Sequence, residues 1–236
     1  MLLEQERDDV VRTCRELAAA GLVVGTSGNV SVRAGDLIAV SPSGLDYADL
    51  TAGLVGVHRL DGTAVDAPLR PTSELPLHLA VYAATGAGAI VHTHPVAATA
   101  VSTLTDELPA IHYYVAMFGG PVPVAPYATY GTEQLARNVA TALSGTALSD
   151  TGLGDTGLGG RTGCLMANHG ALTTGPDLRS ALTKTRHLEW LCEVYLKALA
   201  AGHPGGPRLL PADEIALVAG QLASYGQRAP DGKPGR

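Results

Sequence analysis

The sequence predicts a single α/β domain, on three observations. The chain has 236 residues, of which 46% are hydrophobic, so one domain of this length can bury a substantial core. Segments with apolar residues at helical spacing are interleaved with short segments typical of strands. Aromatic residues are scarce, with one tryptophan and one phenylalanine, so alanine, valine and leucine must supply most of the core.

The first half of the chain begins with a helix and continues with strands. The expected elements are a helix over residues 4–20, a hairpin of residues 30–33 and 37–41, a strand over residues 54–60 and a helix that begins near Ser73. Gly21 follows the first helix, where glycine readily adopts the left-handed conformation that ends it. Leu75, Leu79 and Tyr82 recur at helical spacing and define one face of the second helix.

The second half alternates strands with helices. The expected elements are a strand over residues 88–94, a helix of small residues over 95–103, a strand near 122–125, a helix through Leu135, Val139 and Leu143, a strand over 164–167, and helices over 178–199 and 213–222. Pro95 suits the first position of a helix, where its missing N–H has no partner to lose. The glycine-rich segment 144–163 predicts a mobile surface loop, and a disordered tail over 229–236 is expected to follow a domain of residues 1–228.

Charge, termini and cysteines exclude several functional classes. The net charge of −6 comes from scattered acidic residues, and Lys and Arg form no basic stripe, so we expect no nucleic-acid partner. The N-terminus is too acidic for a signal peptide, and no apolar run approaches the roughly 20 residues of a membrane-spanning helix. We therefore expect a cytoplasmic protein without membrane contact. Cys14, Cys164 and Cys192 show no disulfide or metal-binding spacing and are expected to be buried.

Three histidines predict a catalytic metal site. His92 and His94 lie two residues apart at the end of an apolar strand, so both imidazoles project from the same face. A catalytic zinc ion usually has three protein ligands and one open position, and His169, beside a glycine that permits close approach, is the best third candidate. Imidazoles without thiolate spacing favour zinc, although they also accept iron, copper or nickel. The histidines expected to be surface or satisfied core residues are His58, His78, His187 and His203.

A glutamate and three short polar segments accompany these histidines. Glu74 is expected in the first turn of its helix, where the helix dipole would keep it ionised as a base or a metal ligand. Taken alone, an ordinary first-turn glutamate is the simpler interpretation. Residues 25–29, 41–44 and 72–73 could present N–H groups and hydroxyls to an anion, although each alone is only a turn or a cap. None of the three contains a lysine or matches a P-loop.

These residues lie in segments that resemble the class II aldolase/adducin-head family, and within it the L-fuculose-1-phosphate aldolases. The segments are GTSGNVSVR (25–33), SPSGLDY (41–47), PTSE (71–74), IVHTHPVAATAVS (90–102), LPAIHYYVAMFGGPVPVAPYATYGT (108–132) and ANHGAL (167–172). The resemblance spans nearly the whole chain. Its IHY and PYATYGT stretches discriminate best, because the HxH pair is shared across the wider family.

The resemblance implies a fold, an assembly and a set of site residues. It implies a largely antiparallel central sheet flanked by helices on both faces, in a cyclic homotetramer whose active sites lie at subunit interfaces. It implies one Zn²⁺ per subunit, held by His92, His94 and His169, with Glu74 as the acid/base that also contacts the metal when substrate is absent. The residues implied to bind the phosphate of a ketose 1-phosphate are Gly28, Asn29, Ser43, Gly44, Thr72 and Ser73.

The implied reaction is reversible cleavage of L-fuculose 1-phosphate or a 5-deoxypentulose 1-phosphate, through an enediolate, to dihydroxyacetone phosphate and a small aldehyde. Tyr113 of a neighbouring subunit would exchange a proton with the aldehyde oxygen, and Tyr225 would act as a lid residue. Without the resemblance, Tyr113 is a packed aromatic. Met117 and Phe118 stand where close relatives have smaller residues, so we expect a reshaped pocket that leaves room for a shorter or less polar aldehyde.

Other functions remain open on the same fold. A pentulose-5-phosphate 4-epimerase or a methylthioribulose-1-phosphate dehydratase would use a similar metal site for different chemistry, and the IHY segment favours the aldolase over both. A non-catalytic adducin-like binding module predicts lost metal ligands. The three histidines and Glu74 are all present in this chain.

Overall fold

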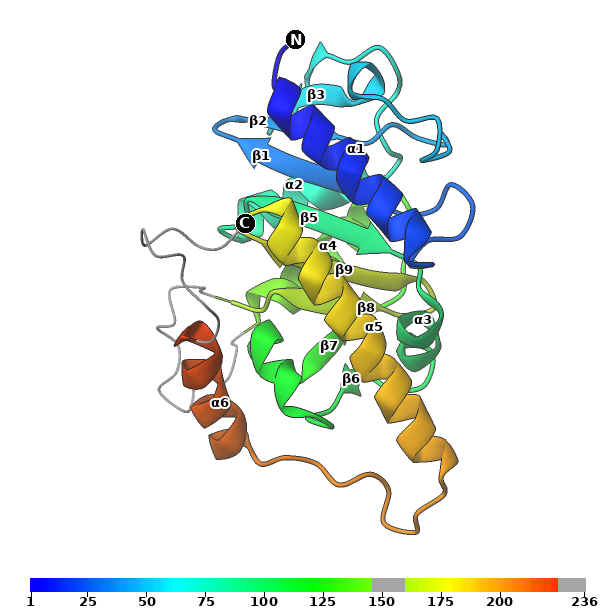
Figure 1. The fold of residues 1–236 in the computed structure, drawn as a ribbon, viewed down its shortest axis with the longest axis vertical. Helices are drawn as coiled ribbons and strands as arrows, with labels where there is room; N and C mark the ends of the chain where they lie inside the picture. The colour runs from blue at the N-terminus through cyan, green and yellow to red at the C-terminus, as the bar shows by residue number, and fades with distance from the viewer. Residues whose placement is uncertain (146–159, 225–236) are drawn as a thin grey trace.

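A nine-stranded sheet forms the centre of the computed structural model, which describes residues 1–145 and 160–224 (Figure 1). The strands are β1 (Asn29–Ala34), β2 (Leu37–Val40), β3 (Gly56–Arg59), β4 (Ala64–Asp66), β5 (Ala89–Thr93), β6 (Glu107–Leu108), β7 (Val122–Ala125), β8 (Gly163–Met166) and β9 (Gly170–Gly175). Their order in the sheet is β4-β3-β2-β1-β5-β9-β8-β7-β6. Only the β7–β8 pair is parallel among the described strands, so the expected antiparallel sheet is confirmed.

Helices cover both faces of the sheet, as expected. They are α1 (Glu4–Ala19), α2 (Leu75–Ala84), α3 (Val96–Ser102), α4 (Glu133–Ser144), α5 (Leu178–Ala200) and α6 (Ala212–Ser224), with short 3₁₀ turns at Ala52–Leu54 and Tyr113–Phe118. In Figure 1, α1 and α5 cross the front of the sheet, whereas α2 and α4 pack together behind it. The predicted α/β architecture is therefore confirmed.

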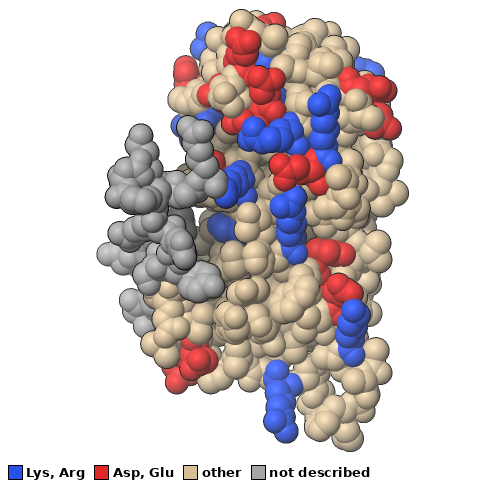
Figure 2. All heavy atoms as spheres, in the orientation of Figure 1, with Lys and Arg blue, Asp and Glu red and all other residues tan. Residues whose placement is uncertain are grey.

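The core lies in layers on either side of the sheet. One cluster fills the space between the sheet and the helices α2 and α4, and a second packs α1 and the start of α5 on the opposite face. A third cluster gathers α3, the middle of α5 and the buried ring of Phe118. At the surface, Arg186 of α5 pairs with Glu16 of α1 at 2.9 Å. Basic and acidic side chains are interspersed over this face, as Figure 2 shows.

Three strands of the sheet differ from the sequence prediction. β9 follows β8 after a tight turn, although only one strand was expected there, and β4 and β6 were not predicted at all. β4 is exposed throughout and β6 has two residues, so neither shows a pattern of apolar alternation. The strand expected over residues 54–60 is shorter, because a 3₁₀ turn occupies Ala52–Leu54 before β3 begins.

The helix boundaries agree closely with the predicted ones, with one informative shift. Gly21 has a φ of +68° after α1, as expected for a glycine that ends a helix. α2 begins at Leu75, so Glu74 is the residue that precedes the helix rather than a residue of its first turn. The predicted loop over 144–163 and the tail over 229–236 lie largely or wholly outside the described residues.

The cysteines are buried and unpaired, as predicted. Within the described ranges, no helix is both long and apolar enough to span a membrane.

Candidate metal centre

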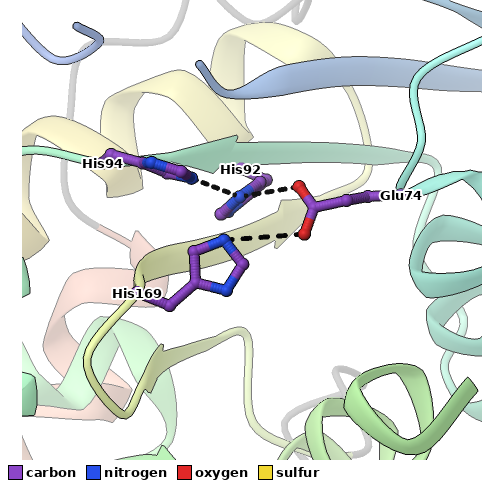
Figure 3. Close-up of side chains that lie close together, drawn as sticks. All are labelled: Glu74, His92, His94 and His169. Atoms are coloured by element: carbon purple, nitrogen blue, oxygen red, sulfur yellow. Dashed lines mark hydrogen bonds and ion pairs between the residues drawn. The ribbon is translucent and has the colours of Figure 1, made fainter. Parts of the chain in front are cut away.

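Four side chains converge where the central strand β5 ends (Figure 3). Glu74, His92, His94 and His169 each offer one ligand atom, and these atoms all lie within 4.8 Å of one another. Three of them are the predicted metal ligands and the fourth is the predicted acid/base. The cluster has the composition of a site that could hold a divalent metal ion.

The position of β5 inside the sheet fixes two of the histidines. His92 pairs with Asn29 of β1 on one side and with Leu172 of β9 on the other, so its backbone is held from both edges. Its side chain is fully buried. Thr93 ends the strand and points to the other face, and His94 follows it, which returns a second imidazole to the side of His92.

A tight turn between β8 and β9 presents His169. Asn168 adopts a left-handed conformation with φ of +54°, which turns the chain sharply after β8. Gly170 then lies so close to β5 that a Cβ atom there would approach the carbonyl oxygen of Thr93 to 2.3 Å. Any side chain at Gly170 would separate the two strands, so glycine is required for His169 to reach the other ligands.

The hydrogen bonds of His92 leave its second nitrogen free for a ligand. Nδ1 lies 2.9 Å from the carbonyl oxygen of Ala171, which can only accept, so Nδ1 carries the proton. Nε2 then faces the acceptor Oε2 of Glu74 at 3.0 Å and Nε2 of His94 at 2.9 Å, which is also an acceptor when the His94 proton is on Nδ1. Lone pairs aimed at one another repel unless a proton or a metal cation lies among them. Because three imidazoles converge, a metal ion fits this donor set.

Without a metal ion, the electrostatics of the cluster favour a charged pair of Glu74 and His92 and neutral rings at His94 and His169, so a bound metal would replace the proton on His92 Nε2. Burial alone would raise the pKa of Glu74, but the charge of His92 and hydrogen bonds from His92 and Asn29 hold it well below its usual range. Burial alone would lower the pKa of His92, but the charge and hydrogen bond of Glu74 raise it. Burial and the neighbouring charges lower the pKa of His94 to about 3 and that of His169 to about 4. Neutral imidazoles are the form that binds a metal.

A series of hydrogen bonds connects Glu74 to other buried polar groups, and this series was not predicted from the sequence. Oε2 of Glu74 accepts a hydrogen bond from Nδ2 of Asn29 at 2.9 Å, and Oδ1 of Asn29 lies 2.5 Å from Nε2 of His78. Oγ of Ser31 then lies 2.7 Å from Nδ1 of His78 and 2.8 Å from the hydroxyl of Tyr82. Burial lowers the pKa of His78 to about 3. His78 is a satisfied core residue, as predicted. In this series of hydrogen bonds, however, only Asn29 lies between His78 and Glu74.

The cluster opens into a cavity of about 250 Å³. All six residues implied to bind phosphate line it together with the acid/base and two of the histidines. The lining residues are Thr26, Ser27, Gly28, Asn29, Pro42, Ser43, Gly44, Thr72, Ser73, Glu74, His94, Tyr130 and His169. No lysine or arginine is among them, so an anion in this cavity must be held by N–H groups, hydroxyls and the metal.

Backbone contacts join two of the three polar segments. Pro42 and Pro71 form an isolated β-bridge between the second and third segments. The N–H of Thr72 donates to the carbonyl of Ser41 at 3.1 Å, which closes the bridge on one side. The spacing of these segments along the chain gave no sign of this pairing, because a single bridge leaves no pattern in the sequence.

Tyr130 lines the cavity but was not predicted as a site residue. Its neighbour Gly131 has a φ of +73° and packs on Ser73, where a Cβ atom would come within 3.0 Å of the Ser73 carbonyl oxygen. This close approach places Tyr130 beside the polar segments. Its only sequence signal was its place in the PYATYGT stretch.

Tyr113, Met117 and Phe118 are not among the residues that line this cavity. Tyr113 begins the 3₁₀ turn, is 40% exposed and packs against His112 with ring centroids 4.1 Å apart. It is not among the residues that line the cavity of its own chain. Phe118 is fully buried in the third core cluster, Met117 packs against that cluster, and neither lines this cavity. Tyr225 lies outside the described residues.

Comparisons with known proteins agree with this geometry. Residues 8–196 match the family model described as the class II aldolase and adducin N-terminal domain. The chain is 35% identical over 231 residues to 5-deoxy-D-ribulose 1-phosphate aldolase of Bacillus thuringiensis, covering 97% of this chain and 100% of the relative. It is 37% identical over 221 residues to L-fuculose phosphate aldolase of Escherichia coli K12, covering 93% and 94%.

A solved structure is also similar. An L-fuculose 1-phosphate aldolase superposes with a TM-score of 0.82 at 32% identity, covering 92% of this chain and 96% of the other. The family model, the relatives and the fold therefore agree with the resemblance seen in the sequence. This chain belongs to the class II aldolase and adducin N-terminal domain family.

Proposed function

We propose that this protein is a zinc-dependent aldolase that reversibly cleaves a ketose 1-phosphate to dihydroxyacetone phosphate and a small aldehyde in the cytoplasm. The observation that carries the proposal is the meeting of two features in one cavity. A buried cluster of three histidines and a glutamate opens directly onto three polar segments that could hold a phosphate group. A site for metal and phosphate together suits a small phosphorylated sugar.

Two relatives support the choice of substrate. Their names specify 5-deoxy-D-ribulose 1-phosphate and L-fuculose phosphate, and the chain matches both along almost its whole length. The two sugars differ in the part that becomes the aldehyde. We therefore infer that the site binds the dihydroxyacetone phosphate half of either sugar in the same way. Recognition of the aldehyde half would then determine which sugar is the physiological substrate.

The residues proposed to hold zinc are His92, His94 and His169. Three neutral imidazoles with one open position form a common catalytic zinc site, and the carbonyl that accepts from His92 Nδ1–H is the kind of outer partner such sites use. When bound, zinc would act as a Lewis acid that stabilises the negative charge developing on the substrate oxygens. Glu74 would complete the site when substrate is absent.

Each remaining group has a proposed task in the reaction. The N–H groups and hydroxyls around Gly28, Ser43 and Ser73 would bind the phosphate and so orient the reacting carbons. In the cleavage direction Tyr113 of a neighbouring subunit would take the proton of the hydroxyl that becomes the aldehyde. The carbon–carbon bond then breaks, and Glu74, after taking a proton from solvent, would protonate the carbon of the enediolate that remains, while Tyr113, which acts as a phenolate, would return its proton to solvent. In the synthetic direction Glu74 would remove that proton.

A panel of substrates tests the proposal. Purified protein of measured zinc content is incubated with L-fuculose 1-phosphate, 5-deoxyribulose 1-phosphate and other ketose 1-phosphates. Released dihydroxyacetone phosphate is coupled to its NADH-dependent reductase. We expect turnover of at least one sugar that disappears on chelation and returns with Zn²⁺. If zinc-loaded protein releases no triose phosphate from any member, the aldolase proposal is wrong.

The same experiment separates the alternatives on this fold. A pentulose 5-phosphate that is epimerised, or methylthioribulose 1-phosphate that is dehydrated, would point to the corresponding enzyme instead. A protein that binds no metal and turns over none of these compounds would fit an adducin-like module. The intact cluster of four ligands favours an enzyme over that module.

A further inference from the structure

The buried chain behind Glu74 indicates a residue that serves the reaction without touching substrate. We propose that His78 is a positioning residue that fixes the side-chain amide of Asn29, so that this amide holds the Glu74 carboxylate in place for proton transfer. The inference deepens the proposed function and rests on it for the role of Glu74. It uses the hydrogen-bonded series Glu74, Asn29, His78, Ser31 and Tyr82.

The direction of each hydrogen bond follows from the carboxylate. An ionised carboxylate can only accept, so the amide nitrogen of Asn29, and not its oxygen, must face Glu74 Oε2. The amide oxygen then faces His78 Nε2 at 2.5 Å and needs a donor. His78 must therefore carry a proton on Nε2. If Nε2 carried no proton, two acceptors would face each other in a buried site. The side-chain amide of Asn29 would then flip so that its nitrogen faced His78.

The hydrogen bonds at the Ser31 and Tyr82 end of the series also require that His78 is neutral and protonated on Nε2. His78 is fully buried, and both of its hydrogen-bond partners are uncharged, so a neutral ring with one proton is favoured. With that proton on Nε2, Nδ1 accepts from the hydroxyl of Ser31. The oxygen of Ser31 in turn accepts from the hydroxyl of Tyr82. Every group in the series has a partner of the required type, and the series ends on the carboxylate.

The helix α2 and the residue before it hold Glu74 and His78 at a fixed separation. Glu74 precedes the helix and His78 lies one turn later, with its N–H donating to the carbonyl of Glu74 at 3.2 Å. Asn29 reaches them from β1, where it pairs with His92. Displacing the Asn29 amide would thus remove one of the two contacts of Glu74 Oε2 and leave only the contact with His92. A proton-transfer group loses rate when it is misplaced by even about 1 Å.

This arrangement changes the task assigned to Asn29. Its side chain uses one end on Glu74 and the other on His78, and only 4% of the residue is exposed. The implied phosphate contact would then fall to its backbone or to the neighbouring segments, and the side chain would serve the acid/base.

Two amide substitutions, each of which imitates one ring nitrogen, test the inference. In His78→Gln the amide nitrogen can occupy the place of Nε2 and still donate to Asn29, while the contact with Ser31 is lost. In His78→Asn the amide oxygen can replace Nδ1 and still accept from Ser31, while Asn29 loses its donor. Each variant gives up one buried hydrogen bond, so a purely structural role predicts equal effects.

The readout isolates the step assigned to Glu74. Zinc-loaded protein is incubated with dihydroxyacetone phosphate alone in D₂O, and exchange of the carbon-bound proton is followed by NMR. We expect His78→Asn to slow exchange by about 10- to 100-fold, as for other supporting groups around metal sites, with little change in zinc content or in the Kd for dihydroxyacetone phosphate. His78→Gln should recover most of the wild-type rate. Equal rates in the two variants, or an unchanged rate in His78→Asn, would overturn the inference.

A second measurement does not depend on the reaction or on the variants folding. Nitrogen-15 NMR of the zinc-loaded wild-type protein reports which ring nitrogen of His78 carries the proton, and the ring resonances are assigned through the backbone signals of the same residue. We expect a neutral ring protonated on Nε2. A proton on Nδ1 contradicts the proposed series. If wild-type protein exchanges no proton yet shows the expected tautomer, the proposed function fails while the hydrogen-bond series stands.

Discussion

At the scale of single residues, the two ring nitrogens of His92 have different partners. Its Nδ1 donates to a backbone carbonyl of β9, and its Nε2 faces the shared centre of the cluster. The sequence could predict that His92 and His94 share a face, because the two-residue period of a strand demands it. It could not predict which nitrogen faces inward, because the carbonyl that decides this is 79 positions away along the chain.

Metal binding should depend on the clustered histidines and not on histidines in general. Replacement of His94 by alanine removes a neutral imidazole from the centre, and we expect the purified variant to lose most of its zinc. His187, half-buried on α5, lies 2.7 Å through Nδ1 from the carbonyl oxygen of Thr183 in its own helix and meets the ring of Tyr114 edge-on, so His187→Ala is the matched control. Metal content is measured by plasma mass spectrometry after dialysis. Full zinc occupancy in His94→Ala would remove this residue from the set of ligands.

Lys184 makes stability depend on pH in the alkaline range. The side chain is 8% exposed and donates to the carbonyl of Thr174, and burial lowers its pKa to about 8, partly opposed by the charge of Asp177. The usual lysine pKa of about 10.4 applies to the unfolded chain. Between these values the unfolded state binds more protons, so stability must rise as pH increases from about 8 to 10.4.

The test compares urea unfolding of the wild type and Lys184→Met across that range. The free-energy difference between them should shift in favour of the wild type by on the order of 1–3 kcal/mol as pH rises, and stay constant below about pH 7. Comparing the two proteins cancels other groups that titrate in the same range. Parallel stability curves would show that Lys184 keeps its ordinary pKa.

At the scale of elements, the short helix α3 is capped from a distant part of the chain. Both carboxylate oxygens of Glu189 on α5 accept from α3, one from the N–H of Ala97 and one from that of Ala98, each at 2.8 Å. The residue before the helix is Pro95, which has no side-chain group to do this. Because α3 begins two residues after His94, this cap also holds the end of the metal-binding segment.

Replacing Glu189 with glutamine should loosen both the helix and the site. The amide can accept from only one of the two N–H groups, and we expect a loss of about 1–2 kcal/mol in unfolding free energy. Hydrogen exchange at Ala97 and Ala98 should quicken, and zinc affinity should fall. The control is Thr132→Ala, which removes the local cap of α4 at 3.3 Å and should cost comparable stability without changing zinc affinity. If Glu189→Gln and Thr132→Ala had equal zinc affinity, the cap of α3 would not be coupled to the metal site.

The elements also show where prediction from the sequence succeeds. α1 and α5 were predicted to within a residue or two, because long amphipathic patterns end at clear signals such as Gly21. β9 was missed, because its residues follow the turn at His169 so closely that they read as part of it. Glu74 was placed one residue too far into its helix. Element boundaries depend on local hydrogen bonds, such as that from the N–H of Glu74 to Thr72, which spacing does not reveal.

At the scale of the whole molecule, the proposed assembly accounts for the position of Tyr113. The residue is partly exposed and does not line the cavity of its own chain, yet its segment was among the most discriminating stretches of the sequence. The family resemblance indicated the tetramer, and no property of a single chain could. We expect light scattering to give about four times the chain mass of 24.1 kDa.

Mixed assemblies test whether Tyr113 acts on a neighbour. Glu74→Gln and Tyr113→Phe subunits should each be nearly inactive alone, since each lacks one proton-transfer group. Unfolded together and reassembled as random mixtures, they should recover activity at about a quarter of the sites, because those sites combine both native groups from different subunits. Activity no greater than the sum of the two separate variants would show that Tyr113 does not act across an interface.

The place of β9 in the sheet also governs when the site can form during synthesis. β9 lies between β5 and β8, so the two histidines of the HxH pair meet their third partner only after the segment through Gly175 has been made. Contacts this distant along the chain form slowly. A nascent chain that ends before His169 carries only two of the clustered histidines and Glu74, with no Ala171 carbonyl to orient His92. We expect that such a chain does not retain the proposed zinc ion. Binding of the proposed ion would therefore report completion of the sheet, and a chain held on a ribosome stalled before residue 169 should not bind zinc.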